Sequence, residues 1–431
     1  MKKKWLKVLV GIVLTILILC GAGYTAWKLA LDPYRETVNY NMVSKDLDTE
    51  LTKEQAQEDL EYLFTHLKNY HPAYVDGSKE LTDAVEKQYK QEVSQLGDTV
   101  TVLQMWQACT RITATMHDGH TGVYEYTFQK KYLDGNPNEL ADKEIISING
   151  VAIEDLYKTF CSQFSYELDS YADYEFHNLI ALEEYLRFLG INTTDGVDIT
   201  YLQNDTENTV HYTFKSMSEE TQPKNSTDYK FVTYSIDEAT NSAMFTLTAC
   251  DYNDEYLTIL EEFFTKVKEA KIGNIIVDLR NNGGGNSMVV NAFLSYLNID
   301  SYQSYYGDVR FGPILWKSKS GIVKNEKQEK VFDGRLYVLT SSQTFSSANM
   351  FAVMVSDNKI GTIVGEITGN MPSSYGDVLS FRMPNSRLYI GVSGKVFHRP
   401  DSSLDSEPLI PDVQVDAQNA LSNVYELIGK K

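Results

Sequence analysis

The longest uncharged apolar stretch of the chain lies at its N-terminus. Residues 8–27 contain no charged side chain, and four lysines precede them within residues 1–7. About 20 apolar residues suffice to cross a bilayer as a helix. Because lysines ahead of such a stretch favour a cytoplasmic N-terminus, the pattern predicts a transmembrane anchor in residues 1–28 and places the rest of the chain outside the cytoplasm.

Two other interpretations of this segment stay open. The small residues Gly21, Ala22 and Gly23 near its end are typical of a cleaved signal peptide. Cys20 offers a lipoprotein attachment site, although the preceding Leu19 is bulky where a small residue is expected. The length of the stretch is closer to a full membrane span than to the short core of a signal peptide.

Residues 29–118 show the apolar spacing of helices. Between residues 56 and 70, leucine and phenylalanine recur at steps of three and four, which places them on one helical face. This helix is expected to end just before Pro72, because proline disfavours helical geometry in the residue that precedes it. With a second helix over 100–114, the pattern predicts a helical N-terminal subdomain.

Residues 119–228 change to a mixed, β-rich pattern. Residues 144–151 alternate as a strand, pass through Asn149-Gly150 and begin a second strand, which is the signature of a hairpin. Further predicted elements are helices over 155–164 and 171–189, a strand over 209–215 and a polar loop over 216–228.

From residue 229 to near the end of the chain, predicted strands and helices alternate. Residues 275–279 are mostly apolar, as expected for a strand that is buried on both faces. Such alternation is typical of an α/β domain. The other predicted elements are strands over 243–247 and 336–340 and helices over 255–270, 286–297 and 347–355.

Charge and cysteine content narrow the function class. The chain of 431 residues has 39 Lys and Arg against 59 Asp and Glu, a formal net charge of −20, and no arginine-rich stripe. A nucleic-acid partner is therefore not expected, since nucleic-acid binding needs a basic face. The four cysteines show no C-x-x-C spacing, so neither a zinc site nor a disulfide framework is predicted, although one bridge stays open.

A glycine-rich segment follows the buried strand. Residues 278–285 read Asp-Leu-Arg-Asn-Asn-Gly-Gly-Gly. Backbone N–H groups of glycines can approach a ligand closely and can stabilise an oxyanion. The segment does not fit the phosphate-loop or dinucleotide fingerprints. Taken alone, it is equally consistent with a plain strand-to-helix turn.

A serine lies where the strand over 336–340 gives way to a helix. Residues 344–348 read Thr-Phe-Ser-Ser-Ala. Free N–H groups at a helix N-terminus favour developing negative charge, so Ser346 is a candidate nucleophile. The alternative is that Ser346 or Ser347 is only a helix cap.

A histidine pair offers a base for that serine. Residues 116–121 read Met-His-Asp-Gly-His-Thr. Serine needs a base to accept its proton, and histidine is the usual one, so His117 or His120 is a candidate. The two histidines and Asp118 could also bind a metal, but no further motif with ligand spacing accompanies them, and no metal or cofactor is expected.

Taken in this order, the three segments resemble the tail-specific or C-terminal-processing serine peptidases (peptidase family S41), and in particular their tricorn-like branch, which has an Asp-Gly-His-Thr element. The resemblance extends from about residue 66 to about residue 415 and includes Val-Gly-Glu at 364–366. It implies a crotonase/ClpP-like catalytic domain with Ser346 as nucleophile and His120 as base. Backbone amides of Gly283 or Gly284 and of Ser347 would bind the oxyanion.

Two departures from the family pattern affect the site. Members with a Ser-Lys dyad have a lysine shortly after Gly-Glu-x-Thr, and this chain has Met371 there. Histidine is thereby left as the base. Tricorn-like members place a glutamate before a Pro-Asp pair; here Glu407 is the first choice for the orienting acid, with Asp405 and Asp401 as alternatives.

The resemblance also suggests a PDZ-like insert, because residues 143–151 are similar to part of that peptide-binding β-domain. The predicted units are the anchor, the helical subdomain, the insert and the catalytic domain, over 1–28, 29–118, 119–228 and 229–431. The predicted function is a membrane-anchored, extracytoplasmic serine endopeptidase acting on proteins or peptides. An inactive scaffolding protein with the same fold and an esterase stay open, and no oligomeric state is predicted.

Overall fold

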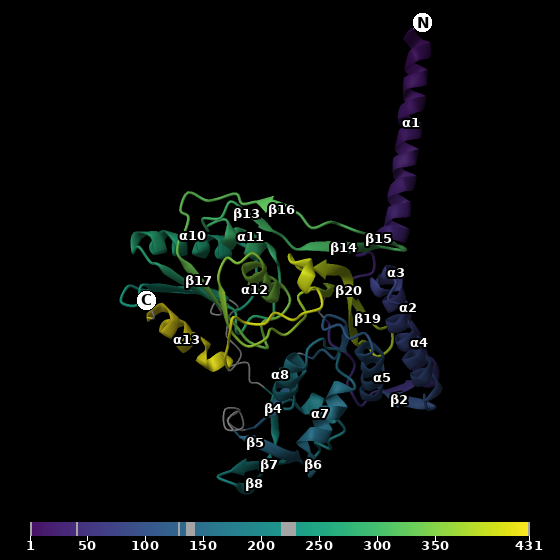
Figure 1. Ribbon diagram of the computed structural model, residues 1–431. Coiled ribbons are helices and arrows are strands. Elements are labelled where there is room, and N and C mark those ends of the chain that lie inside the picture. Colours follow the sequence, from purple (N-terminus) through teal and green to yellow (C-terminus); the bar gives the residue numbers. More distant parts are fainter. Residues whose placement is uncertain (1, 40–41, 128–129, 135–142, 217–229, 430–431) are drawn as a thin grey trace.

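The computed structural model of the protein describes residues 2–39, 42–127, 130–134, 143–216 and 230–429 (Figure 1). The polar loop predicted over 216–228 lies outside the described residues, except for its first residue. An N-terminal helix, α1 (Lys2–Ala26), continues into a π-helical turn, η1 (Trp27–Leu31), and projects from the body of the molecule. The 23 residues Leu9–Leu31 are long and apolar enough to cross a membrane.

The N-terminal helical region contains α2 (Lys53–Tyr70), α3 (Ala73–Asp76), α4 (Lys79–Ser94) and α5 (Val102–Ala114). The helix α2 ends directly before His71-Pro72, as predicted. The predicted second helix begins two residues late because Thr99–Thr101 forms β2, which pairs with β1 (Glu50–Thr52). Thr52 and Thr101 each close a capping box at the start of the helix that follows.

The β-rich region contains a four-stranded sheet in the order β6-β5-β7-β8. The predicted hairpin is present, and Asn149 and Gly150 have φ values of +48° and +74°, as a tight two-residue turn requires. The helix predicted over 171–189 is in fact two helices, α8 and α9. The elements are β5 (Glu144–Ile148), β6 (Val151–Ala152), α7 (Ile153–Cys161), α8 (Asp169–Leu179), α9 (Glu183–Phe188), β7 (Val197–Gln203) and β8 (Thr206–Tyr212), with β4 (Lys131–Leu133) paired to β9 (Phe214–Ser216).

The α/β region is built on a six-stranded sheet in the order β10-β11-β12-β17-β18-β21. Only β10 is antiparallel to its neighbour. Alternate residues of β12 and β17 pack on opposite faces: Ile275 and Val338 join a core with α10, α11 and α12, whereas Ile276 and Leu339 face α13. The elements are β10 (Val232–Asp237), β11 (Ser242–Leu247), α10 (Asp254–Glu269), β12 (Asn274–Asp278), α11 (Met288–Leu294), β17 (Arg335–Thr340), α12 (Ser347–Asp357), β18 (Thr362–Gly365), β21 (Val413–Gln414) and α13 (Ala417–Gly429).

The prediction of uninterrupted strand–helix alternation after residue 229 was wrong for residues 301–324 and 374–398. These residues form antiparallel strands, most of them in a second sheet of order β15-β14-β20-β19, which β3 joins by pairing with β20. The strands are β3 (Gly122–Tyr124), β13 (Ser301–Gln303), β14 (Tyr306–Phe311), β15 (Ile314–Trp316), β16 (Ile322–Lys324), β19 (Ser374–Arg382) and β20 (Tyr389–His398).

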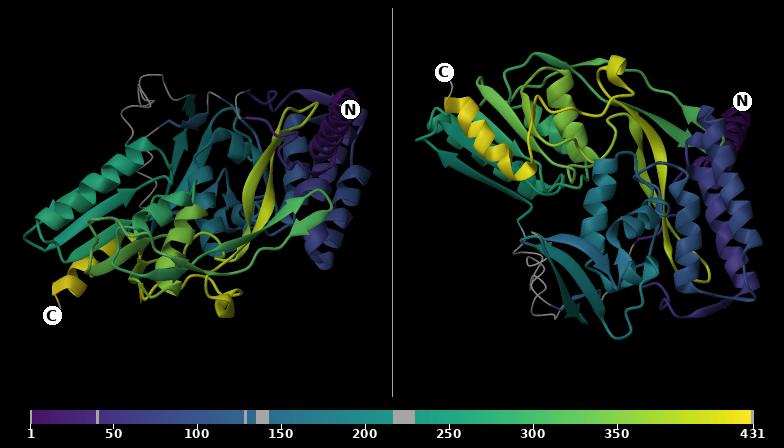
Figure 2. Two further views of the ribbon diagram at one scale, coloured as in Figure 1. Left: turned by 90° about the horizontal axis from the view of Figure 1, so that it is seen from above. Right: turned by 60° about the horizontal axis from the view of Figure 1, so that its bottom comes forward.

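This second sheet connects the two halves of the body. Leu379 and Ile390 of β19 and β20 share a hydrophobic core with the N-terminal helices and the β-rich region. Figure 2 shows the same arrangement from two further sides, with the N-terminal helices and the α/β layers on either side of the β19–β20 ribbon. The pairing of β3 with β20 fixes the segment that carries His120.

Candidate active site

Ser346 lies in the turn between β17 and α12 and has a strained backbone. Its φ and ψ are +52° and −123°, a region that residues other than glycine rarely adopt. The Ser346 amide donates a hydrogen bond to Oδ1 of Asn370 at 2.7 Å, which helps to hold the turn. Among the described residues, the Ser346 hydroxyl makes no hydrogen bond, so it is free to act on a ligand.

The neighbouring Ser347 has a structural partner. It is buried, and its hydroxyl donates to the carbonyl oxygen of Gly285 at 2.7 Å. This bond ties the first turn of α12 to the glycine-rich segment. Of the two serines, Ser346 therefore has the geometry of a nucleophile.

The glycine-rich segment packs directly on the serine turn. Gly284 has a φ of +105°, and a Cβ placed there would lie 2.6 Å from the Cβ of Ser346 and 3.0 Å from the Ser347 nitrogen. The Gly284 amide already donates to Oδ1 of Asn282 at 2.8 Å. The amides of Gly283 and Ser347 have no acceptor in the described part of the chain, and nothing lies within 4 Å of a Cβ built at Gly283.

His120 lies next to the serine turn through an aromatic contact. Its ring centroid is 4.7 Å from that of Phe345, the residue that precedes Ser346. The imidazole is 9% exposed, and its Nδ1 is buried, without a hydrogen bond, 3.8 Å from Oδ1 of Asp118. Between the described His120 and Ser346 side chains, no hydrogen bond is formed.

Asp118 is fully buried beneath His120 and is surrounded by donors. Its Oδ1 accepts the His120 amide at 2.9 Å, and its Oδ2 accepts the hydroxyls of Thr121 and Ser393 at 2.6 Å each. Nε2 of His71 lies 3.1 Å from Oδ2. Burial raises the pKa of Asp118, but the interactions with His120 and His71 outweigh it and hold that pKa well below its usual value.

Glu167, from the loop between α7 and α8, is the second acid beside His120. Its Oε1 accepts the Gly119 amide at 3.2 Å and its Oε2 accepts the Met371 amide at 2.8 Å. Burial, with the charge of Asp118, raises the pKa of Glu167 to about 7, although His120 and the two amides act in the opposite direction. Glu167 thus bridges the histidine segment and the position where a dyad lysine was expected.

Two carboxylates and an imidazole also match the donor types of a metal site. Ligand atoms of Asp118, His120 and Glu167 all lie within 4.8 Å of one another. However, each of the four carboxylate oxygens already accepts at least one N–H or O–H group of the protein. This arrangement satisfies the carboxylates without a cation, and it suits stabilisation of a protonated imidazole.

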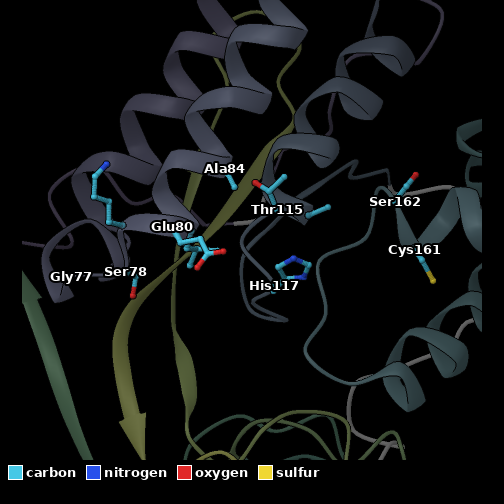
Figure 3. A pocket seen from close by; sticks show the side chains of 11 residues that line it. Gly77, Ser78, Glu80, Ala84, Thr115, His117, Cys161 and Ser162 are labelled. Carbon is cyan, nitrogen blue, oxygen red and sulfur yellow. The ribbon is translucent and has the colours of Figure 1, made fainter.

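His117, the other candidate base, faces a different part of the molecule. It is exposed and lines a pocket of about 790 Å³ between the start of α4, the end of α5 and the end of α7. Figure 3 shows its ring between Glu80 and the pair Cys161 and Ser162. No residue of the serine turn or of the glycine-rich segment lines this pocket.

The structure does not bring the three acids named from the sequence to His120. Glu407 is exposed, and its backbone carbonyl accepts a hydrogen bond from Arg399. Asp405 accepts the hydroxyl of Ser373 at 2.7 Å, and Asp401 is exposed beside the short helix η2 (Ser402–Leu404). In the described part of the chain, none of the three contacts the imidazole.

Sequence reasoning missed three residues that shape the site. Neither His71 nor Asn370 belongs to one of the motifs that predict the site. Glu167 had no motif at all, since it is one acid in a loop between two helices. All four cysteines are free, so the bridge left open by the sequence is not formed.

Comparison with known proteins identifies a matching family model and similar folds. Residues 241–415 match the model of peptidase family S41. Mature CPAF complexed with lactacystin is similar in structure at 13% identity, over 88% of this chain and 97% of that one, with a TM-score of 0.60. The photosystem II D1 C-terminal processing protease is 15% identical over 87% and 98%, with a TM-score of 0.51. The predicted fold class is confirmed.

Proposed function

We propose that this serine-type peptidase, whose residues 241–415 match the model of peptidase family S41, is a membrane-anchored, extracytoplasmic endopeptidase with Ser346 as nucleophile and His120 as base. One observation carries the assignment of the site. The strained Ser346 turn packs against Gly284 on one side, while Phe345 holds the His120 ring on the other.

The proposed reaction is acyl transfer to serine. As the Ser346 hydroxyl attacks a peptide carbonyl carbon, His120 accepts the hydroxyl proton. The amides of Gly283 and Ser347 donate to the resulting oxyanion. The Gly284 amide is excluded from this role because it already donates a hydrogen bond to Oδ1 of Asn282. His120 then protonates the departing amine, and water hydrolyses the acyl-enzyme by the reverse sequence.

For the orienting acid we propose Asp118 together with Glu167 in place of Glu407. Asp118 lies 3.8 Å from Nδ1 of His120, which leaves Nε2 for the serine proton. Both carboxylates stabilise the imidazolium that forms during attack. Because Glu167 also holds the Met371 amide, it occupies the region where dyad members of the family have a lysine.

The cellular setting belongs to the same proposal. The span Leu9–Leu31 anchors the chain, and the lysines before it place the N-terminus in the cytoplasm and the catalytic domain outside it. Proteins or peptides are the proposed substrates. The β6-β5-β7-β8 sheet with α7 is the proposed PDZ-like insert, and an extended peptide added to a strand edge is the ligand that such a domain takes.

One observation favours a second candidate, an inactive protein that binds peptides on the same fold. The described Ser346 hydroxyl is not hydrogen-bonded to His120, and the family lysine is replaced by Met371. In enzymes without substrate, catalytic hydrogen bonds are often long and tighten only in the complex. The first candidate therefore fits the site better.

A fluorophosphonate probe tests the two candidates, because it labels only an activated serine. The full chain in detergent is incubated with the probe and, separately, with an unfolded protein substrate. We expect labelling and cleavage by the wild type and by Ser347→Ala, and neither by a folded Ser346→Ala variant. A wild type that is folded but neither labels nor cleaves would support the binding protein instead.

A further inference from the structure

The hairpin β14–β15 and the neighbouring β16 present unusually exposed apolar side chains. Trp316 and Ile322 are 67% and 77% exposed, more than any other large hydrophobic residue described after residue 43. Ile314 is 51% exposed. An exposed apolar patch of this kind marks a surface that meets a protein or a membrane.

The register of the hairpin shows which way this patch faces. Trp316 pairs with Val309, and Ile314 pairs with Phe311. Residues directly opposite each other in an antiparallel pair have their side chains on the same face. The Phe311 ring lies 5.5 Å from the ring of Trp27, at the end of the N-terminal helix, so the apolar face of the hairpin is the face that the helix touches.

The opposite face of β14 is held inside the body. Arg310 is buried and donates hydrogen bonds to the carbonyl oxygens of Lys68 and His71. The hairpin turn itself touches η1, because Gly312, with a φ of +56°, packs against the carbonyl of Ala30. The hairpin therefore stands at the point where the N-terminal helix leaves the body, and Figure 1 shows β13 and β16 along the same side.

The charge of this patch is opposite to that of the whole chain. Between Ile314 and Lys324 there are three lysines and no acid, whereas the chain carries a net charge of −20. Lys317, Lys319 and Lys324 are exposed, and none of them forms an ion pair with a described residue. Tryptophan is enriched at both membrane–water interfaces, and a lysine side chain can lay its apolar stem on such a surface while its charged end reaches a lipid phosphate.

We propose that this surface, made of Ile314, Trp316, Ile322, Lys317, Lys319 and Lys324, rests on the phosphate-bearing headgroups of the outer leaflet of the membrane that the N-terminal helix crosses. The inference depends on the anchor proposed above. Trp316 and the two isoleucines enter the interface, and the lysines contact lipid phosphates. A second copy of the chain fits this surface less well, because that copy would have to lie between the surface and the membrane, next to the N-terminal helix. The contact fixes the orientation of the catalytic body above the bilayer.

Quenching of Trp316 by brominated lipids tests the proposal. The full chain is reconstituted into vesicles of phosphatidylcholine and phosphatidylglycerol with brominated acyl chains. The difference in fluorescence emission between the wild type and Trp316→Phe gives the emission of Trp316 alone. We expect strong quenching that weakens in the combined variant Lys317→Glu, Lys319→Glu, Lys324→Glu. In the Trp316→Phe background, Val151→Trp on β6, at the end of the body far from the helix (Figure 1), should stay unquenched.

Alkaline carbonate extraction of the same vesicles tests separately whether the N-terminal helix anchors the chain in the bilayer. If the chain stays in the bilayer but Trp316 is not quenched, the surface proposal is overturned and the anchor stands. If carbonate releases the chain, the anchor fails and the surface proposal fails with it. Peptidase activity, measured on the same samples, reports the catalytic assignment independently of both results.

Discussion

Gly284 packs against Ser346 so closely that there is no room for a side chain on Gly284. A Cβ on Gly284 would lie 2.6 Å from the Cβ of Ser346 and 2.9 Å from the Phe345 carbonyl oxygen. Gly284 also has a φ of +105°, which costs any other residue about 1–3 kcal/mol. The position of the nucleophile therefore depends on glycine at this site.

The first prediction concerns that contact. Gly284→Ala should lower kcat by about 100-fold or more, because displacing Ser346 and the Ser347 amide weakens both attack and oxyanion binding. Gly283→Ala is the matched control, since open space surrounds that position and its amide is kept. Rates of peptide hydrolysis and of fluorophosphonate labelling measure the effect. Equal losses in the two variants would contradict the special role of Gly284.

The second prediction separates the two histidines. His120→Ala should reduce kcat/KM by about 10²–10⁴-fold, because the serine loses its base. His117→Ala should leave it within about twofold, since this exposed residue lies in a pocket apart from the serine turn. The measurement is steady-state hydrolysis at several pH values. A large loss in His117→Ala would reverse the assignment.

The third prediction concerns the acid. Glu167 has a pKa raised to about 7, so it ionises as pH rises through neutrality and then stabilises the imidazolium. We expect part of the rise in kcat/KM near pH 7 to disappear in Glu167→Gln, with kcat lowered about tenfold or more. Glu407→Gln should keep the wild-type profile, because Glu407 is exposed and does not contact His120.

Stability gives a second readout of Glu167 with a defined sign. A carboxyl whose pKa is raised from 4.5 to about 7 by folding contributes stability that is fully present below 4.5 and is lost as pH rises through 7. The free energy of unfolding of the wild type, relative to that of Glu167→Gln, should therefore decrease as the pH rises from 4.5 to about 7. Urea denaturation across this window measures the difference; a constant difference would mean that Glu167 does not titrate there.

The fourth prediction concerns Asp118, whose pKa is lowered by folding. Its contribution to stability is present above its ordinary value of 3.8 and is lost as pH falls below that value. Asp118→Asn should lower the free energy of unfolding by about 3 kcal/mol at neutral pH, because a buried, fully hydrogen-bonded charge is removed. The difference in free energy of unfolding between the wild type and Asp118→Asn should become smaller as the pH falls below 3.8.

A surface aspartate provides the control for this measurement. Asp83 is exposed and pairs with the exposed Lys79 on α4. Asp83→Asn should change the free energy of unfolding by less than about 1 kcal/mol both at neutral pH and in acid, since exposed ion pairs contribute little to stability. If the two variants behaved alike, Asp118 would have no special role in stability.

The sequence predicted those elements whose pattern is local. The apolar stretch that became β12 is buried at every position, and the helix α2 ends where Pro72 requires. The antiparallel hairpin of β19 and β20 was not predicted, because β20 is buried at six successive positions instead of alternating, contains glycine and also pairs with β3 and β14, which are far away in the chain. Pairings of that kind are set by packing, which a local pattern does not contain.

The residues of the candidate site also divide into those with a local sequence signal and those positioned by contacts far away in the chain. Ser346 and His120 could be named as candidates from the sequence because each lies in a short motif, Thr-Phe-Ser-Ser-Ala and Asp-Gly-His-Thr. Glu167 was not found, because its role comes from two amides that are 48 and 204 positions away in the chain. Nothing in the residues around it distinguishes it from the other acids of an acidic protein.

The two hydrogen bonds of Glu167 have a consequence for control of the enzyme. Glu167 lies between α7 and α8 in the β-rich region, yet its carboxylate accepts hydrogen bonds from the amides of Gly119, next to His120, and of Met371, next to Asn370. A displacement of the loop between α7 and α8 would break both hydrogen bonds, and it would therefore change the surroundings of His120 and of the Ser346 turn together. Binding of a ligand that altered the packing of this loop would therefore be thermodynamically linked to the geometry of the active site.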